Sequence, residues 1–496
     1  MFLGIDVGTS GVKAILTDAQ SRIVDQQTVA LSISRPHPLW SEQNPQEWWE
    51  ATLAAIDQIK SRKPAEIAAV RGIGLAGQMH GAVTLDKNNN VIRPAILWND
   101  GRCEEECRIL EEKIPALRKI TGNIAMPGFT APKILWLARH EPENFAKIDK
   151  VLLPKDYVRF RFTGAFFSDM SDAAGTLWLD VANRRWSDDM LAACGLRQEQ
   201  MPVLREGSDV AGILKAELAQ RWGMGADVVF AGGAGDNAAG AVGIGALGEG
   251  QAFISLGTSG VYFAGTNQFR ACPEKTVHAF CHAVPATWHQ MGVILSAASC
   301  IKSAANFLGA SSDQELAGLV HDDNLNLHNN VVFLPYLSGE RTPHNNPAAT
   351  GSFFGLTHET TRADLVQAIL EGVAFAFADC QDALAAAGTD ADDIMLIGGG
   401  ARNRTWGSLI SAALNKRILY VADGDQGPAF GGAKLARIAA TGEKINDVAH
   451  RPEVTKTVIP NEKLKNYLSP KLEKYRSLYG QLKPLYAYGN HSQEKV

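Results

Sequence analysis

The chain has 496 residues, of which 46% are hydrophobic, and its formal net charge at pH 7 is −5. This length predicts two to four domains, and the apolar content is ample for their cores. A chain without a basic excess is not expected to bind nucleic acid or an anionic membrane surface.

Seven cysteines are scattered along the sequence, with neither a second close pair nor clustered histidines to complete a zinc site. We therefore expect reduced thiols in a cytoplasmic protein. The sequence begins with an apolar strand pattern, so we expect no signal peptide, and no apolar run approaches the roughly 20 residues of a membrane span.

The first expected element is a β-hairpin formed by residues 2–7 and 11–17, whose turn lies in the run IDVGTSGV (5–12). A Gly-rich turn between two apolar runs is typical of a tight hairpin, and its successive N–H groups and hydroxyls can bind an anion. Asp6, at the end of the first strand, suits Mg²⁺ held through water, and Lys13 is the basic residue nearest the turn. Either side chain could instead be a solvated strand end.

A third strand is expected over residues 22–33, and a helix follows it. Asn44 is the expected N-cap, Pro45 fits the first helical position, and Glu47 completes a capping box.

A buried strand over residues 70–77 runs into the sequence QMHG (78–81). His80 in this run could line a binding pocket, or it could be a core histidine bonded to a backbone carbonyl. Trp98, in the run WNDGR, offers a flat apolar face beside donors and acceptors, which a polyol needs. It could equally belong to the core.

Residues 103–150 are expected to be mainly helical, and residues 152–180 to form a more irregular insertion. Residues 227–243 then predict a strand, a Gly-rich loop and a helix. The loop contains a lone acid, Asp236, among residues too small to block access to it. An aspartate there can accept the proton of a substrate hydroxyl during phosphoryl transfer, or it can cap the helix.

The hairpin is repeated in the second half of the chain. Residues 254–261 read ISLGTSGV and are identical to residues 5–12 at six of eight positions, with Ser255 where the first copy has Asp6. Two copies in two halves predict two lobes that present equivalent loops to one polyphosphate.

Three later elements complete the prediction. A helix is expected from Thr361, with Asp364 at its capping-box position. Residues 393–414 read as a strand, a Gly turn and a helix, and such a turn can bind phosphate, although tight packing explains Gly runs as well. A last helix is expected over 430–441, and the polar sequence beyond about residue 460 is expected to be peripheral.

No low-complexity linker separates the two halves, so we expect a compact hinge near residues 245–251. It divides an N-terminal domain (1–246) from a C-terminal domain (247–496). Alternating strands and helices predict an α/β sandwich in each domain.

Six motifs occur in order along essentially the whole chain: IDVGTSGVK, GQMHG, WNDGR, GAGDNAAGAVGIG, SLGTSGV and GGGARN. Together with GFTAPKILWLARH and GSFFGLTHETTRADLVQAILEG, they resemble the FGGY family of carbohydrate kinases. The resemblance implies an α/β fold of two ribonuclease H-like domains, of the type found in actin and hexokinase. ATP, Mg²⁺ and a sugar would meet in the cleft between them.

The resemblance also implies roles for individual residues. Asp236 would be the catalytic base, and Asp6 the acid linked to Mg²⁺. The predicted sugar site consists of Met79, His80, Trp98, Asp236 and Asn237. The predicted nucleotide contacts are Thr9, Ser10, Lys13, Gly257, Thr258, Ser259, Gly399, Gly400 and Asn403.

The Met79–His80 pair distinguishes among possible substrates, since a glycerol kinase would be expected to have Arg-Glu at these positions. The expected reaction is phosphorylation of D-xylulose by Mg·ATP to D-xylulose 5-phosphate, and the alternative is another pentulose, such as ribulose, or a polyol. A non-kinase ATPase of the actin or chaperone type is disfavoured, because such a switch needs no polyol pocket. The sequence leaves open whether the chain forms a homodimer.

Overall fold

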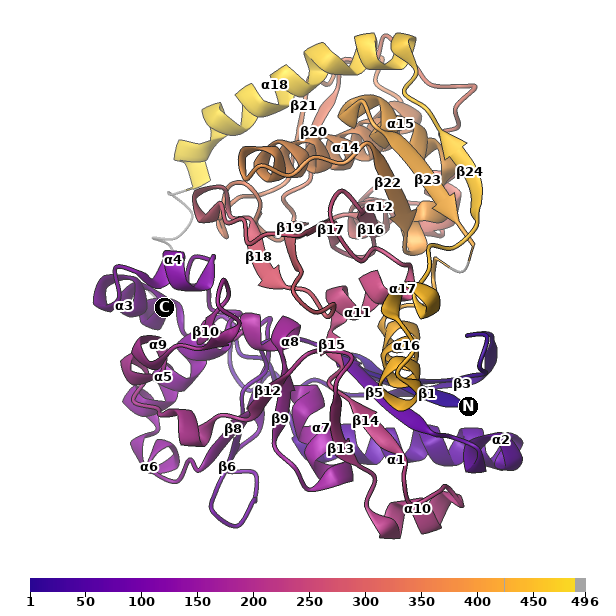
Figure 1. Ribbon diagram of the computed structural model, residues 1–496. Helices are drawn as coiled ribbons and strands as arrows, with labels where there is room; N and C mark the ends of the chain where they lie inside the picture. Colours follow the sequence, from indigo (N-terminus) through magenta and orange to yellow (C-terminus); the bar gives the residue numbers. More distant parts are fainter. Residues whose placement is uncertain (423, 487–496) are drawn as a thin grey trace.

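Each half of the chain is built around a seven-stranded mixed sheet, and the two halves lie one above the other in Figure 1. The structure, a computed structural model, describes residues 1–422 and 424–486. This arrangement confirms the predicted α/β class with two comparable units.

The N-terminal sheet begins with the predicted hairpin and third strand. Its strands are β1 (Phe2–Val7), β2 (Gly11–Thr17), β3 (Ile23–Ala30), β5 (Gly72–Gly77), β13 (Val210–Ile213), β14 (Val229–Ala231) and β15 (Ala234–Gly235). Their order is β13-β14-β5-β1-β2-β3, with β15 paired to β5. Strand β2 is antiparallel to both β1 and β3, whereas β5 lies parallel to β1 and to β14.

The C-terminal sheet repeats this arrangement. Its strands are β16 (Ala252–Leu256), β17 (Gly260–Thr266), β18 (His278–Cys281), β19 (Trp288–Ile294), β22 (Asp393–Ile397), β23 (Arg417–Val421) and β24 (Val454–Val458). Their order is β18-β19-β17-β16-β22-β23-β24. The run β19-β17-β16-β22-β23 has the same sequence order and the same directions as β3-β2-β1-β5-β14. The repeated GTSG motif therefore marks a repeated structural unit.

The helices cover the two sheets and fill the space around them (Figure 1). They are α1 (Pro45–Arg62), α2 (Pro64–Ala68), α3 (Glu104–Lys113), α4 (Leu117–Thr121), α5 (Thr130–His140), α6 (Pro142–Phe145), α7 (Pro154–Thr163), α8 (Met170–Ala174), α9 (Asp188–Ala193), α10 (Ala216–Trp222), α11 (Asp236–Gly243), α12 (Ala298–Phe307), α13 (Asp313–Ala317), α14 (Arg362–Ala386), α15 (Arg404–Leu414), α16 (Pro428–Thr441), α17 (Ile445–Val448) and α18 (Glu462–Tyr486). Within the described ranges, none of them combines the length and the hydropathy that a bilayer span requires.

Short strands form additional two-stranded sheets in both halves. They are β4 (Glu42–Gln43), β6 (Val83–Leu85), β7 (Ala95–Ile96), β8 (Lys150–Leu152), β9 (Phe167–Asp169), β10 (Leu179–Asp180), β11 (Arg185–Trp186), β12 (Val203–Arg205), β20 (Val332–Leu334) and β21 (Ser352–Phe354).

At the start of α1, the structure has the predicted N-cap but not the predicted capping box. The Asn44 side chain accepts a hydrogen bond from Gln46 N at 3.1 Å, so the predicted N-cap is confirmed. The carboxylate of Glu47 instead accepts a hydrogen bond from Ser32 Oγ at 3.3 Å. The predicted capping box is wrong because the chain that follows β3 supplies a competing donor.

At the start of α14, the structure has both hydrogen bonds of the predicted capping box. Thr361 Oγ1 accepts a hydrogen bond from Asp364 N at 3.2 Å, and Asp364 Oδ2 accepts one from Thr361 N at 2.9 Å. This reciprocal pair satisfies donors that the first helical turn would otherwise leave unpaired, so the predicted capping box is confirmed.

Helix α16 comes from the second half of the sequence but packs against the N-terminal sheet (Figure 1). A Cβ atom at Gly74, in β5, would lie 2.0 Å from Gly432 O. On the other side of the helix, a Cβ atom at Gly431 would lie 1.8 Å from Ala239 O in α11. The backbone of α16 is therefore wedged between β5 and α11 at a distance that only glycine permits.

The segment over residues 152–180 is regular and buried, so its prediction as an irregular insertion is wrong. It contains α7, β9, α8 and β10. Its charged residues include Lys155 and Asp172, which have no exposed side-chain surface. Hydropathy gives no sign of this burial, because these charges compensate one another only in three dimensions.

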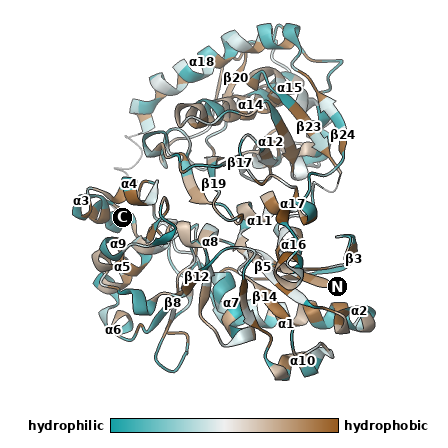
Figure 2. Ribbon diagram, in the orientation of Figure 1, coloured by the Kyte–Doolittle hydropathy of each residue, from teal (hydrophilic) through white to brown (hydrophobic). Residues whose placement is uncertain are grey.

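The last described helix, α18, runs along the outside of the C-terminal half (Figure 1). Hydrophilic and hydrophobic residues alternate along it (Figure 2), and its buried side chains include Leu464, Leu468 and Tyr475. Tyr336 donates a hydrogen bond to the Tyr475 hydroxyl at 2.8 Å. For residues 462–486 the predicted peripheral position is confirmed, although the sequence did not identify the helix. Residues 487–496, which the same prediction includes, lie outside the described residues.

Candidate active site

Asp236 lies where the N-terminal sheet meets α11. It is the first residue of the helix, and Gly235 takes the N-cap position, so Asp236 is not the cap. Its Oδ1 accepts hydrogen bonds from Asn237 N at 2.7 Å and Asn237 Nδ2 at 2.8 Å, while its Oδ2 has no such partner among the described residues. Burial raises the pKa of Asp236 above its ordinary value. The free oxygen can therefore accept a proton from a bound hydroxyl.

Asp6, on β1, lies close enough to Asp236 for the two carboxylates to repel each other. Burial and the charge of Asp236 raise the pKa of Asp6 to about 7, and the charge of Lys13 opposes the shift. Asp6 Oδ1 is buried without a hydrogen-bond partner in the described part of the chain. A nearby cation would favour the charged form of both acids.

His80 has the left-handed backbone conformation, with φ at +72°. Its carbonyl oxygen accepts hydrogen bonds from Lys133 Nζ at 2.8 Å and Thr130 Oγ1 at 3.1 Å, which hold this unusual conformation. Its ring Nδ1 lies 2.6 Å from Gly175 O, so Nδ1 carries the hydrogen and Nε2 is an acceptor. Burial lowers the pKa of His80 to about 3, which keeps the ring neutral.

His80 therefore combines the two alternatives that the sequence left open. Its ring is bonded to a backbone carbonyl, as the core interpretation requires. Its side chain is nevertheless only half-buried, and no Nε2 partner occurs among the described residues. Nε2 is thus free to accept a hydrogen bond from a hydroxyl.

Met79 and Trp98 provide apolar surface at the same place. Met79 is 6% exposed, and a Cβ atom at Gly235 would lie 2.8 Å from its sulfur. Trp98 is 37% exposed, and its Nε1 donates a hydrogen bond to Thr9 Oγ1 at 3.0 Å. The same Thr9 hydroxyl donates to Gln78 Oε1 at 3.0 Å. Trp98 therefore connects the predicted sugar site to the first hairpin.

The two Gly-Thr-Ser-Gly turns present the same pattern of backbone groups. The carbonyl oxygens of Thr9 and Thr258 accept hydrogen bonds from elsewhere in the protein. The N–H groups of Thr9, Ser10, Thr258 and Ser259 donate none to any residue that the structure describes. Successive free N–H groups in a turn form an anion-binding site.

A pocket of about 820 Å³ lies in the C-terminal half, between the second hairpin and the triple-Gly turn. Its lining includes five residues that the sequence assigns to the nucleotide: Gly257, Thr258, Gly399, Gly400 and Asn403. The side chain of Asn403 also caps α15, because it accepts a hydrogen bond from Trp406 N at 3.2 Å.

The first hairpin belongs to the N-terminal half of the molecule. Of its described residues, none lines the 820 Å³ pocket. Lys13 Nζ donates a hydrogen bond to Gln426 O at 3.1 Å, which links β2 to the loop before α16. Among the described residues, the two hairpins therefore do not share this cavity.

Sequence reasoning missed Lys133, whose ammonium group holds the His80 carbonyl. Lys133 is fully buried in α5, together with its helical neighbours Ala131 and Ile134. A lysine inside an otherwise apolar helix is the signal that could have identified it, since an unpaired charge is rarely buried.

Two family models cover most of the chain. Residues 1–243 match the N-terminal domain, and residues 252–440 the C-terminal domain, of the FGGY family of carbohydrate kinases. The chain belongs to the FGGY family of carbohydrate kinases. The resemblance inferred from the motifs is confirmed, and this FGGY kinase uses ATP as a substrate.

Among curated relatives, the xylulose kinases of Escherichia coli (strain K12) and Klebsiella pneumoniae are each 52% identical to this FGGY kinase, over 98% of its chain and 100% of theirs. The crystal structure of a xyloylose kinase from Brucella ovis shares 50% identity, with a TM-score of 0.95 over 98% of this chain and 99% of that one. Plasmodium falciparum glycerol kinase with ADP has a TM-score of 0.86 at 21% identity, over 96% and 97% of the two chains, and shares the fold alone.

Proposed function

We propose that this FGGY kinase transfers the γ-phosphoryl group of ATP to D-xylulose and forms D-xylulose 5-phosphate. The choice of sugar rests on relatives named xylulose kinase that are 52% identical over nearly the whole chain. The chemistry rests on one observation, the Asp236 carboxylate with one oxygen held by Asn237 and the other free.

Asp236 acts as the general base in this proposal. Its free oxygen accepts the proton of the attacking hydroxyl, and its raised pKa makes it a better base than an exposed aspartate. The demand on that base is modest, because a loose phosphoryl transition state requires little deprotonation until the new bond forms.

The sugar lies against Met79, His80, Trp98 and Asn237. His80 Nε2 accepts a hydrogen bond from a hydroxyl of the sugar, and the neutral ring avoids placing a second positive charge beside Lys133. Trp98 and Met79 provide apolar surface for the carbon skeleton.

ATP occupies the pocket beside Gly257, Thr258, Gly399, Gly400 and Asn403. The free N–H groups of both hairpin turns, including that of Ser259, bind its phosphates.

In the first hairpin, Thr9 contributes through its N–H group, because its hydroxyl is already bonded to Trp98 and Gln78. Ser10 contributes in the same way, and the charge of Lys13 favours the polyphosphate.

The residues around Asp6 fit a magnesium ion. Asp6 has a buried oxygen without a hydrogen-bond partner in the described ranges, and its pKa is raised in part by the charge of Asp236. Asp6 would hold Mg²⁺ through water, since this ion keeps much of its hydration shell. When bound, Mg²⁺ neutralises charge on the β- and γ-phosphates.

A coupled assay of ADP release, run with D-xylulose, D-ribulose, glycerol and gluconate, tests the proposal. We expect the highest kcat/KM with D-xylulose. A higher kcat/KM with any other substrate would assign the enzyme to that substrate instead. Asp236→Asn is assayed in parallel, because ADP release that persists undiminished in this variant would come from a contaminating kinase.

A further inference from the structure

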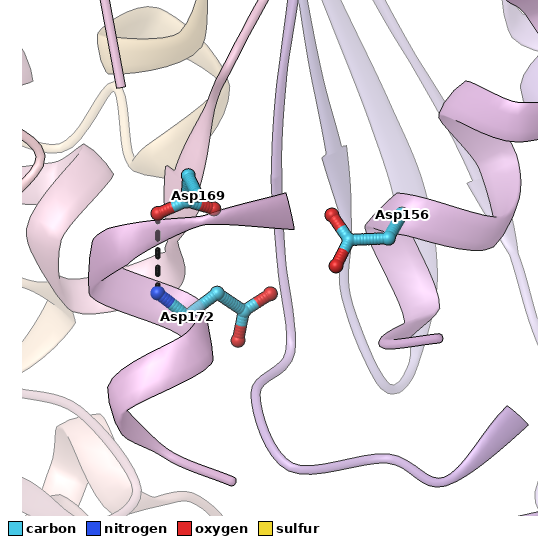
Figure 3. A group of neighbouring side chains, drawn as sticks. All are labelled: Asp156, Asp169 and Asp172. Carbon is cyan, nitrogen blue, oxygen red and sulfur yellow. Dashed lines mark hydrogen bonds between the residues drawn. The ribbon is translucent and has the colours of Figure 1, made fainter. Parts of the chain in front are cut away.

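Five charged side chains are buried together beside the loop that carries Asp236. They are Lys155, Asp156, Arg159, Asp169 and Asp172. Figure 3 shows the three acids, with Asp156 on α7 directed toward the other two across the gap between the elements. One oxygen from each of the three lies within 4.8 Å of the others, which is the spacing of a metal site.

A lysine occupies the centre of this cluster. Lys155 Nζ lies 2.7 Å from Asp156 Oδ1, 2.6 Å from Asp169 Oδ2 and 2.9 Å from Asp172 Oδ2. Arg159 adds a second cation, 2.6 Å from Asp156 Oδ1. The ammonium group takes the position that a metal ion would need, so the cluster is not a cation site.

Burial changes the ionisation of one acid of the cluster. Burial raises the pKa of Asp172 well above its ordinary value, which favours its protonated form. Two cations, Lys155 and Arg159, thus lie among three acids, one of which favours its neutral form. A buried cluster whose opposite charges lie in contact can hold its neighbours in place.

The cluster is bonded to both ends of the loop that precedes Asp236. Arg159 Nη1 donates a hydrogen bond to Gly232 O. At the other end, Gly235 N donates to Ser171 Oγ at 3.1 Å, and Ser171 Oγ in turn donates to Asp169 Oδ1. Ser171 is therefore the link between the buried charges and the residue next to Asp236.

The same short helix also supports His80. Asp169 caps α8 by accepting hydrogen bonds from Ser171 N at 2.9 Å and Asp172 N at 3.1 Å, the second of which is drawn in Figure 3. At the far end of α8, Gly175 O pairs with His80 Nδ1. Helix α8 and its C-terminal cap therefore contact both Gly235, which precedes the proposed base Asp236, and His80, a proposed sugar ligand.

We propose that the buried charge cluster is a positioning device for the Asp236 carboxylate, and that it acts through Ser171. This inference rests on the proposed role of Asp236 as base. Phosphoryl transfer depends on the placement of the reacting groups, and a misplacement of about 1 Å can cost a factor of about 100 in rate. Ser171 itself contacts neither substrate, so it is a positioning residue.

Ser171→Ala tests this inference, and Ser168→Ala is its matched control. Both serines are fully buried, and each donates a short hydrogen bond to a carboxylate of the cluster, Ser168 to Asp156 Oδ2 at 2.6 Å. Only Ser171 also accepts a hydrogen bond from the loop, within the chain that the structure describes.

We expect Ser171→Ala to lower kcat about tenfold while both KM values stay within about twofold. Ser168→Ala should lower the melting temperature by a similar amount and keep kcat within about threefold of wild type. Ser171→Thr, which restores the hydroxyl, should recover most of kcat. Equal losses of kcat in the two alanine variants, or no loss in Ser171→Ala, would overturn the inference.

Hydrogen–deuterium exchange provides a readout that does not depend on the sugar. Peptides that cover residues 232–236 should exchange faster in Ser171→Ala than in Ser168→Ala, while peptides from the C-terminal sheet should not differ. Equal exchange at 232–236 would overturn the inference even if the wild type is active. A wild type that does not phosphorylate D-xylulose would contradict the proposed function alone, because the exchange comparison still decides the role of Ser171.

Discussion

Asp6 and Asp236 come from different elements, yet the charge of Asp236 raises the pKa of Asp6. Burial alone raises both pKa values, and the charge of Asp236 adds to the shift at Asp6. A metal ion or a substrate hydroxyl reverses part of this effect, because each stabilises a negative oxygen. The two acids therefore respond to ligands together, and two substitutions can separate their roles.

Asp236→Asn should leave the fold and both binding sites nearly intact, because asparagine keeps the size and one acceptor oxygen. It cannot accept a proton, so kcat should fall by the roughly 10²–10⁴ typical of the loss of a general base. Steady-state kinetics with D-xylulose measures this change, and calorimetric titration with ADP provides the control for nucleotide binding. Turnover within a few-fold of wild type would contradict the assignment of Asp236 as the general base.

Asp6→Asn should change how stability depends on pH. The pKa of Asp6 is about 7 in the folded protein against an ordinary value of 3.8, so between these values the folded state holds a proton that the unfolded state has lost. Wild-type stability relative to Asp6→Asn must therefore fall as the pH rises from about 4 to about 7. By pH 8 the variant should gain about 3–4 kcal/mol relative to wild type, compared with pH 4.

Urea unfolding of both proteins at pH 4 and pH 8, without divalent cations, measures this difference. Added Mg²⁺ at pH 8 should stabilise the wild type and not Asp6→Asn. A stability difference that is independent of pH would contradict the shifted pKa, and equal responses to Mg²⁺ would remove Asp6 from the proposed metal site.

At the scale of elements, the sequence predicted the features that depend on residues close together along the chain. The hairpins follow from Gly-rich turns between apolar runs, and the start of α14 follows from the reciprocal bonds of Thr361 and Asp364. Where a partner comes from elsewhere in the chain, the prediction failed. Glu47 bonds to Ser32, and Lys155 pairs with Asp169 and Asp172 at the start of α8, so neither interaction can be read from spacing along the sequence.

The residues of the candidate site also fall into those that local motifs predict and those that depend on distant contacts. The motifs located Asp236, His80 and the residues of both turns, because small residues and isolated polar groups stand out in apolar surroundings. They did not identify Lys133 or Ser171, whose roles depend on contacts with His80 O and Gly235 N across the fold. Supporting residues of this kind carry no motif of their own.

The packing of α16 makes Gly431→Ala a test at this scale. In a helix interior, alanine normally replaces glycine with a gain of roughly 0.4–1 kcal/mol. At Gly431 the added Cβ would lie 1.8 Å from Ala239 O, so the helix must shift, and we expect a net loss of about 1–3 kcal/mol.

Gly480→Ala, in α18, is the matched control, because a Cβ atom there would meet no heavy atom within 4 Å. It should raise the melting temperature slightly, whereas Gly431→Ala should lower it. Thermal unfolding of the two variants beside wild type makes the comparison, and a Gly431→Ala protein as stable as Gly480→Ala would show that the close contact is not required.

At the scale of the molecule, the chain passes between its two halves more than once. It crosses first between α11 and β16, near the predicted hinge at 245–251, and again on either side of α16. The division of the chain at residue 246 stays a prediction, and α16 has to be counted with the N-terminal sheet. Relative motion of the halves must therefore bend all of these connections together.

We expect D-xylulose to bring the two halves closer together, because closure excludes water from a phosphoryl-transfer site. Small-angle scattering should give a smaller radius of gyration with saturating D-xylulose than without it. A sugar that the enzyme does not phosphorylate should leave the radius unchanged. The same radius in the presence and absence of D-xylulose would count against closure.

The position of α16 also determines the order in which the protein can be completed on the ribosome. The strands of the N-terminal sheet are all synthesised by residue 235, but the helix that covers β1 and β5 begins only at Pro428. For nearly two hundred residues of synthesis, the apolar surface beneath α16 has no cover from its own chain. A nascent chain in this state is a natural client for a chaperone, and a fragment that ends at residue 246 would keep that surface exposed.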